Sequence, residues 1–253
     1  MLQDHKVLMS GIAPEPWSLE TFRLHPEWTK HLTALLPSLI PCLDKRPLLE
    51  YTAPNGHKTR ARRDVAFFSD TAGGYQLSKL SSLVSKSRSF KPFPLLAYLL
   101  REMNEVLGEG YTGIIVNHYE NGWRSIGPHS DNPKGNGLHG VVTISLGATR
   151  IYRVSKVGDI DQKSVFDLHM EHGDVVLMKG AFQKLYHHSV PPEEHVMLPR
   201  TSLTFRRVIE DTKEATKEST KESNTQFNST EQTCAKQTLG GEQTSAKKAK
   251  REI

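Results

Sequence analysis

Apolar residues recur at a helical spacing in two segments of the first half of the chain. The first follows Pro26, a favourable first-turn residue, and places apolar side chains at i, i+4, i+7 and i+8: Trp28, Leu32, Leu35 and Leu36. The second runs from Pro94 to Leu107 and stops at Gly108, because glycine accepts the left-handed conformation that closes a helix. We therefore predict two amphipathic helices.

Short segments with the pattern of extended chain fill most of the remainder. Leu49–Thr52 and Thr59–Arg62 flank Pro54-Asn55-Gly56, and Asn-Gly is a strong hairpin signal. After Gly110, strand-like segments follow one another with glycine and proline turns and no helical pattern between them, which indicates a β-sandwich or barrel. These segments are Gly113–Tyr119, Val141–Leu146, Arg150–Val154, Ser164–His169, Asp174–Met178, Leu185–Val190 and Thr201–Ile209.

Residues 210–253 differ in composition from the rest of the chain. They include almost no large apolar side chain, so they cannot bury enough surface to offset the entropy of ordering, and we expect them to be disordered. Eight Lys or Arg balance eight Asp or Glu there, so the formal charge of +5 belongs to residues 1–209. A basic folded domain favours anionic partners such as nucleic acid, although this charge is also ordinary for a soluble protein.

Cysteine usage and hydropathy indicate an intracellular protein. Cys42 and Cys234 do not form a disulfide framework, and the N-terminus lacks the continuous apolar stretch of a signal peptide. The longest apolar run is broken by Pro37 and Pro41, so we predict no membrane span. We expect a nuclear or cytoplasmic location. Residues 247–251, Lys-Lys-Ala-Lys-Arg, suit a nuclear import signal and, equally well, a solvated charge run.

Candidate metal ligands gather in the β-rich half. His129 and Asp131 stand at i and i+2, so their side chains point to the same face of an extended strand. In Leu185–Val190, alternation puts His187 and His188 on opposite faces, so only one of them joins the site. Two histidines and a carboxylate are typical ligands of non-haem Fe(II). Zinc is the competing metal, and the spacing alone does not separate the two.

The next strand carries two arginines on one face. Alternation turns Leu203 and Phe205 outward and four polar side chains inward: Arg200, Ser202, Thr204 and Arg206. Inward arginines are costly unless they meet anions, and guanidinium groups pair bidentately with carboxylates. We therefore predict a small dicarboxylate between the two arginines. The alternative is an ordinary strand edge with surface arginines.

Several segments together resemble the AlkB family of Fe(II)- and 2-oxoglutarate-dependent nucleic-acid dioxygenases, most closely its eukaryotic DNA-repair members. The resemblance runs from about Ala61 to Val208. It rests on Asn117-His118-Tyr119, Gly122, Ile126–Asp131, Val142–Gly147, Tyr186–Pro191 and Arg200-x5-Arg206. It implies a mainly β chain with flanking helices, in which a double-stranded β-helix (jelly-roll) core follows an N-terminal helical and hairpin nucleotide-recognition lid.

The resemblance also implies roles for individual residues. Fe(II) would be held by His129, Asp131 and His188. The distal carboxylate of 2-oxoglutarate would be held by Asn117, Tyr119 and Arg200, and the carboxylate beside the keto group by Arg206. Ser202 stands where the family often has Asn, and its hydroxyl still offers a hydrogen bond to the cosubstrate. With O2, and ascorbate helpful in vitro, the implied reaction removes methyl groups from 1-methyladenine or 3-methylcytosine type lesions in alkylated DNA or RNA.

The same resemblance places substrate contacts in the lid: Arg62, Arg63, Tyr75 and Ser78. Tyr75 is the candidate for a residue that faces the base, and packing within the lid explains it equally well. A paired base must first be flipped out of the duplex. Pro133 replaces an acidic residue of the family and Leu77 replaces a stacking aromatic. These departures leave two alternatives open: an oxygenase acting on protein or a small molecule, and a non-catalytic nucleic-acid-binding module.

The expected organisation has three parts. Residues 1–48 form an N-terminal helical extension. Residues 49–209 form the dioxygenase domain, with the lid in 49–90 and the jelly-roll core in 110–209. Residues 210–253 form the disordered tail. We expect a monomer.

Overall fold

The computed structural model describes residues 1–13, 15–45, 49–52, 58–61, 63–71, 74–76, 84–131, 140–159, 161 and 163–208. The chain divides into two units, Met1–Glu210 and Asp211–Ile253. The predicted tail and its basic run lie outside the described residues, so the description below concerns the first unit.

The first unit is built mainly from strands. The described strands are β1 (Leu2–Gly11), β2 (Trp17–Leu24), β3 (Leu49–Thr52), β4 (Lys58–Ala61), β5 (Asp64–Phe68), β6 (Gly74–Gln76), β7 (Val84–Arg88), β8 (Gly113–Tyr119), β9 (Ile126–His129), β10 (Val141–Gly147), β11 (Arg150–Lys156), β12 (Ser164–Met170), β13 (Asp174–Gly180), β14 (Tyr186–Val190) and β15 (Arg200–Arg206). The helices are α1 (Pro26–Leu39), η1 (Ile40–Cys42), α2 (Pro94–Leu107) and α4 (Phe182–Leu185).

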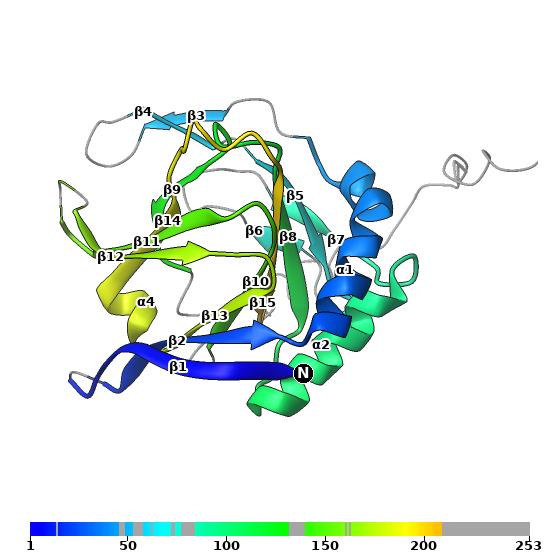
Figure 1. The fold of residues 1–253 in the computed structure, drawn as a ribbon, viewed down its shortest axis with the longest axis horizontal. Helices are drawn as coiled ribbons and strands as arrows, with labels where there is room; N and C mark the ends of the chain where they lie inside the picture. Colours follow the sequence, from blue (N-terminus) through cyan, green and yellow to red (C-terminus); the bar gives the residue numbers. More distant parts are fainter. Residues whose placement is uncertain are drawn as a thin grey trace, which may run out of the picture. The chain divides into compact units, whose positions relative to one another are not determined.

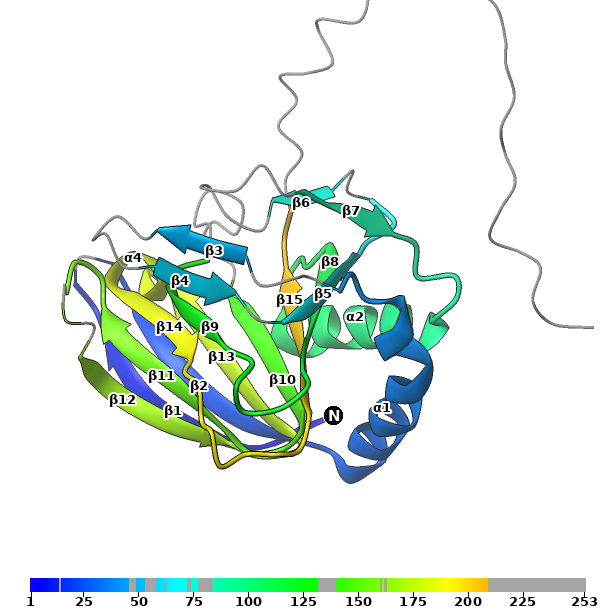
Figure 2. The same cartoon turned by 90° about the horizontal axis from the view of Figure 1, so that it is seen from above.

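Two facing sheets make the jelly-roll. The larger has nine strands in the order β1-β2-β13-β10-β15-β8-β5-β7-β6, and the smaller has four in the order β12-β11-β14-β9. The smaller sheet covers one face of the larger, and α1 and α2 cover the other (Figures 1 and 2). Strands β3 and β4 pair as a separate hairpin that contacts β9. The mainly β class with flanking helices is therefore confirmed.

Both predicted helices are present. Helix α1 buries Leu32 and Leu39, and α2 buries Leu96, Leu99 and Met103. Gly108 ends α2 with a φ of 63°, in the left-handed region, and its backbone N–H donates to the carbonyl of Asn104. Helical spacing predicted these elements because each lays one apolar stripe on the larger sheet.

The predicted N-terminal helical extension is wrong for the residues before α1. β1 and β2 form an antiparallel hairpin at the edge of the larger sheet, and β2 also pairs with β13 from Arg23–Asp174 to Trp17–Gly180. Pairing with a strand some 150 positions away is invisible to local periodicity. The edge position of β1 leaves most of its side chains exposed, which weakens the alternation that would have marked it as a strand.

The predicted strands of the C-terminal half are confirmed with the following differences. β9 was not among the predicted strands, and β15 ends at Arg206, where the sequence predicted a strand as far as Ile209. Leu185 ends the short helix α4, and β14 begins only at Tyr186. The hairpin of β3 and β4 is confirmed through its pairing of Leu49 with Ala61 and Thr52 with Lys58, while its Asn-Gly turn lies outside the described residues.

Most buried apolar side chains of the described residues belong to two clusters with different partners, and a third, smaller cluster contains Val65, Phe67 and Ile115. The first cluster joins the larger sheet to α1 and α2 and includes Leu203 and Phe205. The second fills part of the space between the sheets and includes Leu19, Val154 and Phe182. Since Leu203 and Phe205 face the helices, the polar side chains of β15 face the smaller sheet, as alternation predicted. The space between the sheets is therefore apolar in one part and polar in another.

A buried ion pair ties together the loops that flank β9 and β14. Arg150 is 1% exposed and Glu193 is 9% exposed, and the Arg150 Nε donates to Glu193 Oε2 at 2.9 Å. The same carboxylate oxygen accepts the backbone N–H of Ile151 at 2.8 Å. The remaining guanidinium nitrogens donate to the carbonyl oxygens of Asn121, Gly122, Arg124 and Pro191. Arg150 therefore anchors two loops through one side chain.

Replacing Glu193 by alanine is expected to lower the free energy of unfolding by about 3–5 kcal/mol, because it leaves the buried Arg150 without its counter-charge. Glu15→Ala is the matched control, since the Lys184–Glu15 pair is about half exposed and contributes roughly 1 kcal/mol or less. Urea unfolding of both variants measures the difference. Equal losses would show that the Arg150–Glu193 pair does not stabilise the loops as we argue.

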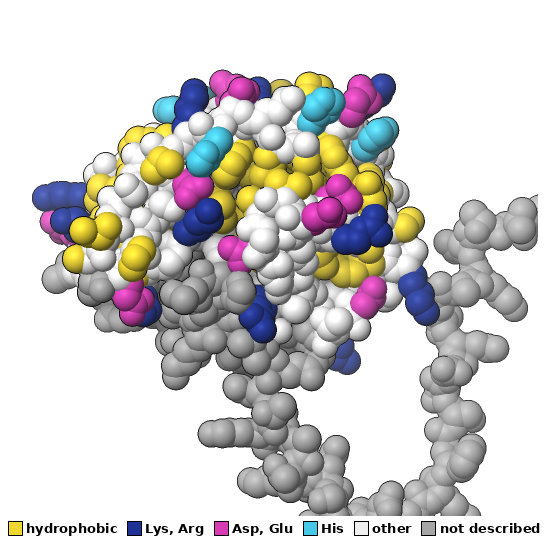
Figure 3. Space-filling view, turned by 90° about the horizontal axis from the view of Figure 1, so that it is seen from below, with side chains coloured by type: hydrophobic (Ala, Val, Ile, Leu, Met, Phe, Trp, Pro, Cys, Tyr) yellow, Lys and Arg dark blue, Asp and Glu magenta, His cyan; other side chains and the backbone are white. Residues whose placement is uncertain are grey.

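Charged side chains of both signs lie on the face of the molecule that Figure 3 draws. Among the described residues, no helix is long and apolar enough to cross a membrane. Figure 3 shows one face, on which acidic and basic side chains lie interspersed around apolar ones. The described part of this face therefore lacks the one-sign charge that attracts a phosphate backbone.

Candidate metal centre and cosubstrate pocket

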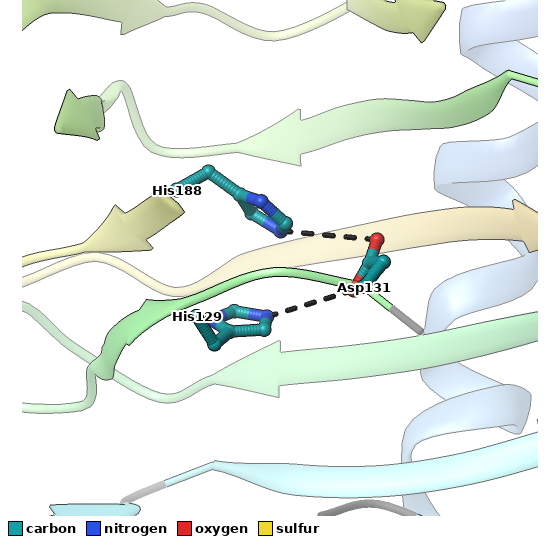
Figure 4. Close-up of side chains that lie close together, drawn as sticks. All are labelled: His129, Asp131 and His188. Atoms are coloured by element: carbon teal, nitrogen blue, oxygen red, sulfur yellow. Dashed lines mark ion pairs between the residues drawn. The ribbon is translucent and has the colours of Figure 1, made fainter. Parts of the chain in front are cut away.

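His129, Asp131 and His188 converge in the space between the sheets (Figure 4). β9 pairs with β14 so that His129 lies opposite His188, and Asp131 follows two residues after His129. Asp131 Oδ1 lies 3.8 Å from His129 Nε2, and Asp131 Oδ2 lies 3.9 Å from His188 Nε2. All three ligand atoms lie within 4.8 Å of one another. The structure thus brings together the three residues that the sequence pattern selected.

Both histidines are neutral at neutral pH. Burial lowers the pKa of His129 to about 4 and lowers the pKa of His188 well below its ordinary value. The His129 Nδ1 donates to the carbonyl of Gly127 at 2.8 Å, which leaves Nε2 with its lone pair toward Asp131. The His188 ring stacks on Tyr152, with centroids 5.5 Å apart and planes 14° apart.

Asp131 is a buried carboxyl group that is bonded through one of its two oxygens. It is 2% exposed, and burial raises its pKa to about 7, while the nearby Arg63 opposes this rise. Arg206 Nη2 donates to Oδ1, whereas Oδ2 accepts no hydrogen bond from the described residues. A metal ion at this position would compensate the buried charge and release any proton that Asp131 holds in its absence.

The three residues fit a metal ion. Ligand atoms that share one metal lie roughly 3–4 Å apart, because each is roughly 2 Å from the ion. The two Asp131–His separations agree with that spacing. Two neutral imidazoles and one carboxylate also match the ligand set that leaves positions free on non-haem Fe(II).

The inward faces of three adjacent strands of the larger sheet form a polar strip beside the triad. β15 supplies Arg200, Ser202, Thr204 and Arg206, β8 supplies Asn117 and Tyr119, and β10 supplies Thr143 and Ser145. Asn117 Nδ2 donates to Ser202 Oγ at 3.5 Å, and the hydroxyls of Thr143 and Thr204 are 3.1 Å apart. The pairing of Tyr119 with Arg200 and of Ser145 with Ser202 aligns the three strands.

Arg200 lies at one end of this strip, as a buried guanidinium for which the described part of the chain offers no carboxylate partner. It is 1% exposed, its Nε donates to Ser145 Oγ at 2.8 Å, and its guanidinium lies 5.5 Å from the Tyr119 ring centroid. Among the described residues, none of its partners is a carboxylate. Burial lowers its pKa from the ordinary value. The carboxylate of a bound dicarboxylic acid would supply the missing anion.

Arg206 lies at the other end of the strip and touches the metal triad through Asp131. It is 8% exposed, and burial lowers its pKa to about 9. The two arginines therefore occupy the ends of one polar strip, with the metal ligands beside Arg206. A dicarboxylate that spans the strip would present one end to Arg200 and the other to Arg206 and the metal.

Sequence reasoning missed three residues of this site. Thr143 and Ser145 lie on the inward face of β10, and Tyr152 on β11 stacks on His188. Alternation with Val142, Ile144 and Leu146 could have identified Thr143 and Ser145. Tyr152 carried no local signal, because a tyrosine in a strand is most often part of the core.

The expected substrate contacts are only partly described. Arg63 is half-buried, and its Nε donates to Asn117 Oδ1 at 2.7 Å. It thus touches a residue that was expected to hold the cosubstrate. Tyr75 lies in β6, where only the backbone is described. Arg62 and Ser78, together with Leu77 and Pro133, lie outside the described residues.

Comparison with known proteins decides the family. Residues 26–206 match the model of the 2OG-Fe(II) oxygenase superfamily. The chain belongs to the 2OG-Fe(II) oxygenase superfamily. Fe(II), 2-oxoglutarate and O2 are therefore the expected cofactor and cosubstrates, and His129, Asp131 and His188 form the candidate iron site. This membership favours iron over zinc as the bound metal. The spacing of the ligands alone did not distinguish the two.

Individual relatives within this superfamily confirm the resemblance to the AlkB family. The chain is 32% identical over 129 residues to human alpha-ketoglutarate-dependent dioxygenase alkB homolog 3, covering 48% of this chain and 45% of that protein. The Bos taurus protein of that name gives the same figures. Identity is 29% over 159 residues to the Bos taurus DNA oxidative demethylase ALKBH2, covering 60% of this chain and 55% of that protein. The chain spans about half the length of these relatives.

Proposed function

We propose that this 2OG-Fe(II) oxygenase is a dioxygenase that oxidatively demethylates alkylated bases, of the 1-methyladenine or 3-methylcytosine type, in DNA or RNA. The observation that carries the proposal is the joint geometry of the triad and the polar strip. A His-Asp-His ligand set lies beside one of two buried arginines, and the second lacks a carboxylate partner among the described residues. That arrangement suits a keto-dicarboxylic acid and iron better than a zinc hydrolase.

The nucleic-acid part of the proposal has separate support. A relative that matches 60% of this chain is named a DNA oxidative demethylase. The formal charge of +5 resides in residues 1–209, and the hairpin of β3 and β4 contacts β9, the strand that carries His129. A hairpin in contact with this strand is well placed to contact a base presented to the metal. We further expect a monomer in the nucleus or cytoplasm.

We assign the following binding roles to residues of the site. His129, Asp131 and His188 hold the iron, and the neutral histidines keep their Nε2 lone pairs available for it. Arg200 binds the distal carboxylate of 2-oxoglutarate, with Tyr119 and Asn117 beside it. Arg206 binds the carboxylate next to the keto group and also holds Asp131. Ser202 bonds to Asn117 and so keeps the amide toward the cosubstrate.

When bound, Fe(II) and 2-oxoglutarate supply the oxidation: one atom of O2 enters succinate as CO2 leaves, and the other enters the methyl group, which departs as formaldehyde. The protein contributes by positioning the methyl group and excluding water from the buried pocket. Arg62, Arg63, Tyr75 and Ser78 are proposed to contact the substrate. Arg63 would link the two parts of the site, since it follows β4 along the chain and bonds to Asn117.

A turnover panel tests the proposal directly. Purified protein with Fe(II), ascorbate and 2-oxoglutarate is given single- and double-stranded DNA and RNA oligonucleotides that contain 1-methyladenine or 3-methylcytosine. We expect succinate formation together with an oligonucleotide mass loss that corresponds to exchange of methyl for hydrogen. The His129→Ala protein serves as the inactive control.

Other outcomes separate the alternatives. Succinate formation without demethylation of any oligonucleotide would indicate an oxygenase of this superfamily that acts on protein or a small molecule. Absence of succinate under all conditions, with nucleic-acid binding retained, would indicate a non-catalytic binding module.

A further inference from the structure

The backbone of Asp131 is held by a side chain from a distant part of the chain. Asp131 lies two residues beyond the end of β9, so no strand pairing engages its backbone N–H. This N–H donates instead to Gln183 Oε1 at 2.9 Å, and Gln183 is 7% exposed. Gln183 belongs to α4, which runs directly into β14 and His188. One carboxamide thus joins the two segments that carry the metal ligands.

The carboxamide is itself held in one orientation. Its Nε2 donates to Met178 Sδ at 3.1 Å, and the hydroxyl of Tyr152 donates to the same sulfur at 3.0 Å. Because Oε1 accepts a backbone N–H, the amide cannot be turned over without losing both contacts. Tyr152 in turn stacks on His188. A short chain of contacts therefore runs from Asp131 through Gln183, Met178 and Tyr152 to the ring of His188.

A second bond supports the same segment. Ser130 Oγ donates to the carbonyl of Tyr186 at 3.1 Å. The segment His129–Asp131 is thereby attached to the corner between α4 and β14 at two successive residues. These contacts orient ligands that come from different strands, which is what the supporting residues of a metal site do.

We infer that Gln183 is a positioning residue of the metal centre, whose carboxamide places the Asp131 carboxylate opposite His188 before the metal binds. The inference rests on the proposed function through the identity of the three ligands. The carboxamide of Gln183 bonds to the backbone of Asp131 and to Met178, so its effect is on metal affinity through the position of Asp131.

The test compares metal binding by the full chain and by the Gln183→Leu variant. Metal-free protein is titrated with Co(II) and followed by visible absorption, so the readout does not depend on turnover. Leucine keeps the volume but cannot accept the Asp131 N–H. We expect the dissociation constant to rise about tenfold, the lower end of the range for residues that orient metal ligands.

Asn104→Leu is the matched control. Asn104 also accepts a backbone N–H through its carboxamide, from Tyr111 at 2.7 Å, but it lies in α2 on the far side of the larger sheet. It should lower thermal stability without changing Co(II) affinity. If Asn104→Leu weakens Co(II) binding as much as Gln183→Leu, the effect is one of general stability and the inference is overturned.

A second variant keeps the test decisive if Gln183→Leu does not fold. Met178→Leu removes the sulfur that holds Nε2 and should weaken Co(II) binding by a smaller factor. Unchanged affinity in either single variant overturns the inference. Equal Co(II) binding by wild type and His188→Ala would instead refute the metal centre, and with it the proposed function.

Discussion

Replacing His188 by alanine is expected to abolish metal-dependent turnover of 2-oxoglutarate, whereas replacing the adjacent His187 should leave it intact. The two residues are neighbours in β14, but their side chains point to opposite faces. His188 Nε2 faces Asp131 across 3.9 Å, while His187 lies opposite Ser155 of β11 and belongs to no described metal cluster. Loss of one of three ligands should lower the metal affinity by more than about a hundredfold, because a hundredfold is the upper end of the range for residues that only support ligands.

Two measurements check this prediction. Fe(II) or Co(II) binding to the two variants gives the affinity, and succinate formation gives the turnover. His187→Ala is a close control because it removes the same chemical group from the same strand. Retained turnover in His188→Ala, or its loss in His187→Ala alone, would remove His188 from the ligand set.

Arg200→Ala is expected to raise the 2-oxoglutarate concentration needed for half-maximal turnover by about 30-fold to a few thousandfold. Arg200 is buried and has no carboxylate partner among the described residues, so its guanidinium is available to a bound carboxylate. Truncating one partner of a buried, hydrogen-bonded charge pair costs about 2–5 kcal/mol, and each 1.4 kcal/mol is about tenfold. Arg200→Lys keeps the charge without the bidentate geometry. Its 2-oxoglutarate requirement should lie between those of the wild type and Arg200→Ala.

An altered cosubstrate separates the role of Arg200 from a general defect. 2-Oxopentanoate has the same chain length as 2-oxoglutarate but lacks the distal carboxylate. The wild type should strongly prefer 2-oxoglutarate, and Arg200→Ala should lose most of that preference. Affinity for oligonucleotides should change little. A collapse of oligonucleotide binding with an unchanged 2-oxoglutarate requirement would assign Arg200 to the substrate instead.

The candidate site could be predicted from the sequence where local backbone geometry fixes the direction in which side chains point. Side chains alternate along an extended chain, so Arg200 and Arg206 had to share a face once the segment was a strand. The same reasoning predicted that His129 and Asp131 lie together, which they do although β9 ends at His129. The same rule separated His187 from His188. Helical periodicity predicted α1 and α2 for an equivalent reason, since each has one face against the larger sheet.

The rest depended on contacts between residues far apart in the chain. β1 and β2 read as polar and irregular because neither shows a continuous apolar face. β2 joins the larger sheet only through its pairing with β13, and β1 pairs with β2 at the edge. Tyr152 and Gln183 carry no local mark of function. Tyr152 joins the site because β11 pairs with β14, which carries His188, and Gln183 joins it because β14, which follows α4, pairs with β9.

The sequence by itself therefore determined the ligand types, the faces they occupy and the superfamily to which the chain belongs. Tertiary structure alone decided which groups meet: that Arg206 contacts Asp131, that Arg63 contacts Asn117, and that Gln183 holds the backbone of Asp131. The physical reason is that side-chain direction follows from local backbone geometry, whereas contact across sheets depends on strand register, which is set by packing over the whole fold.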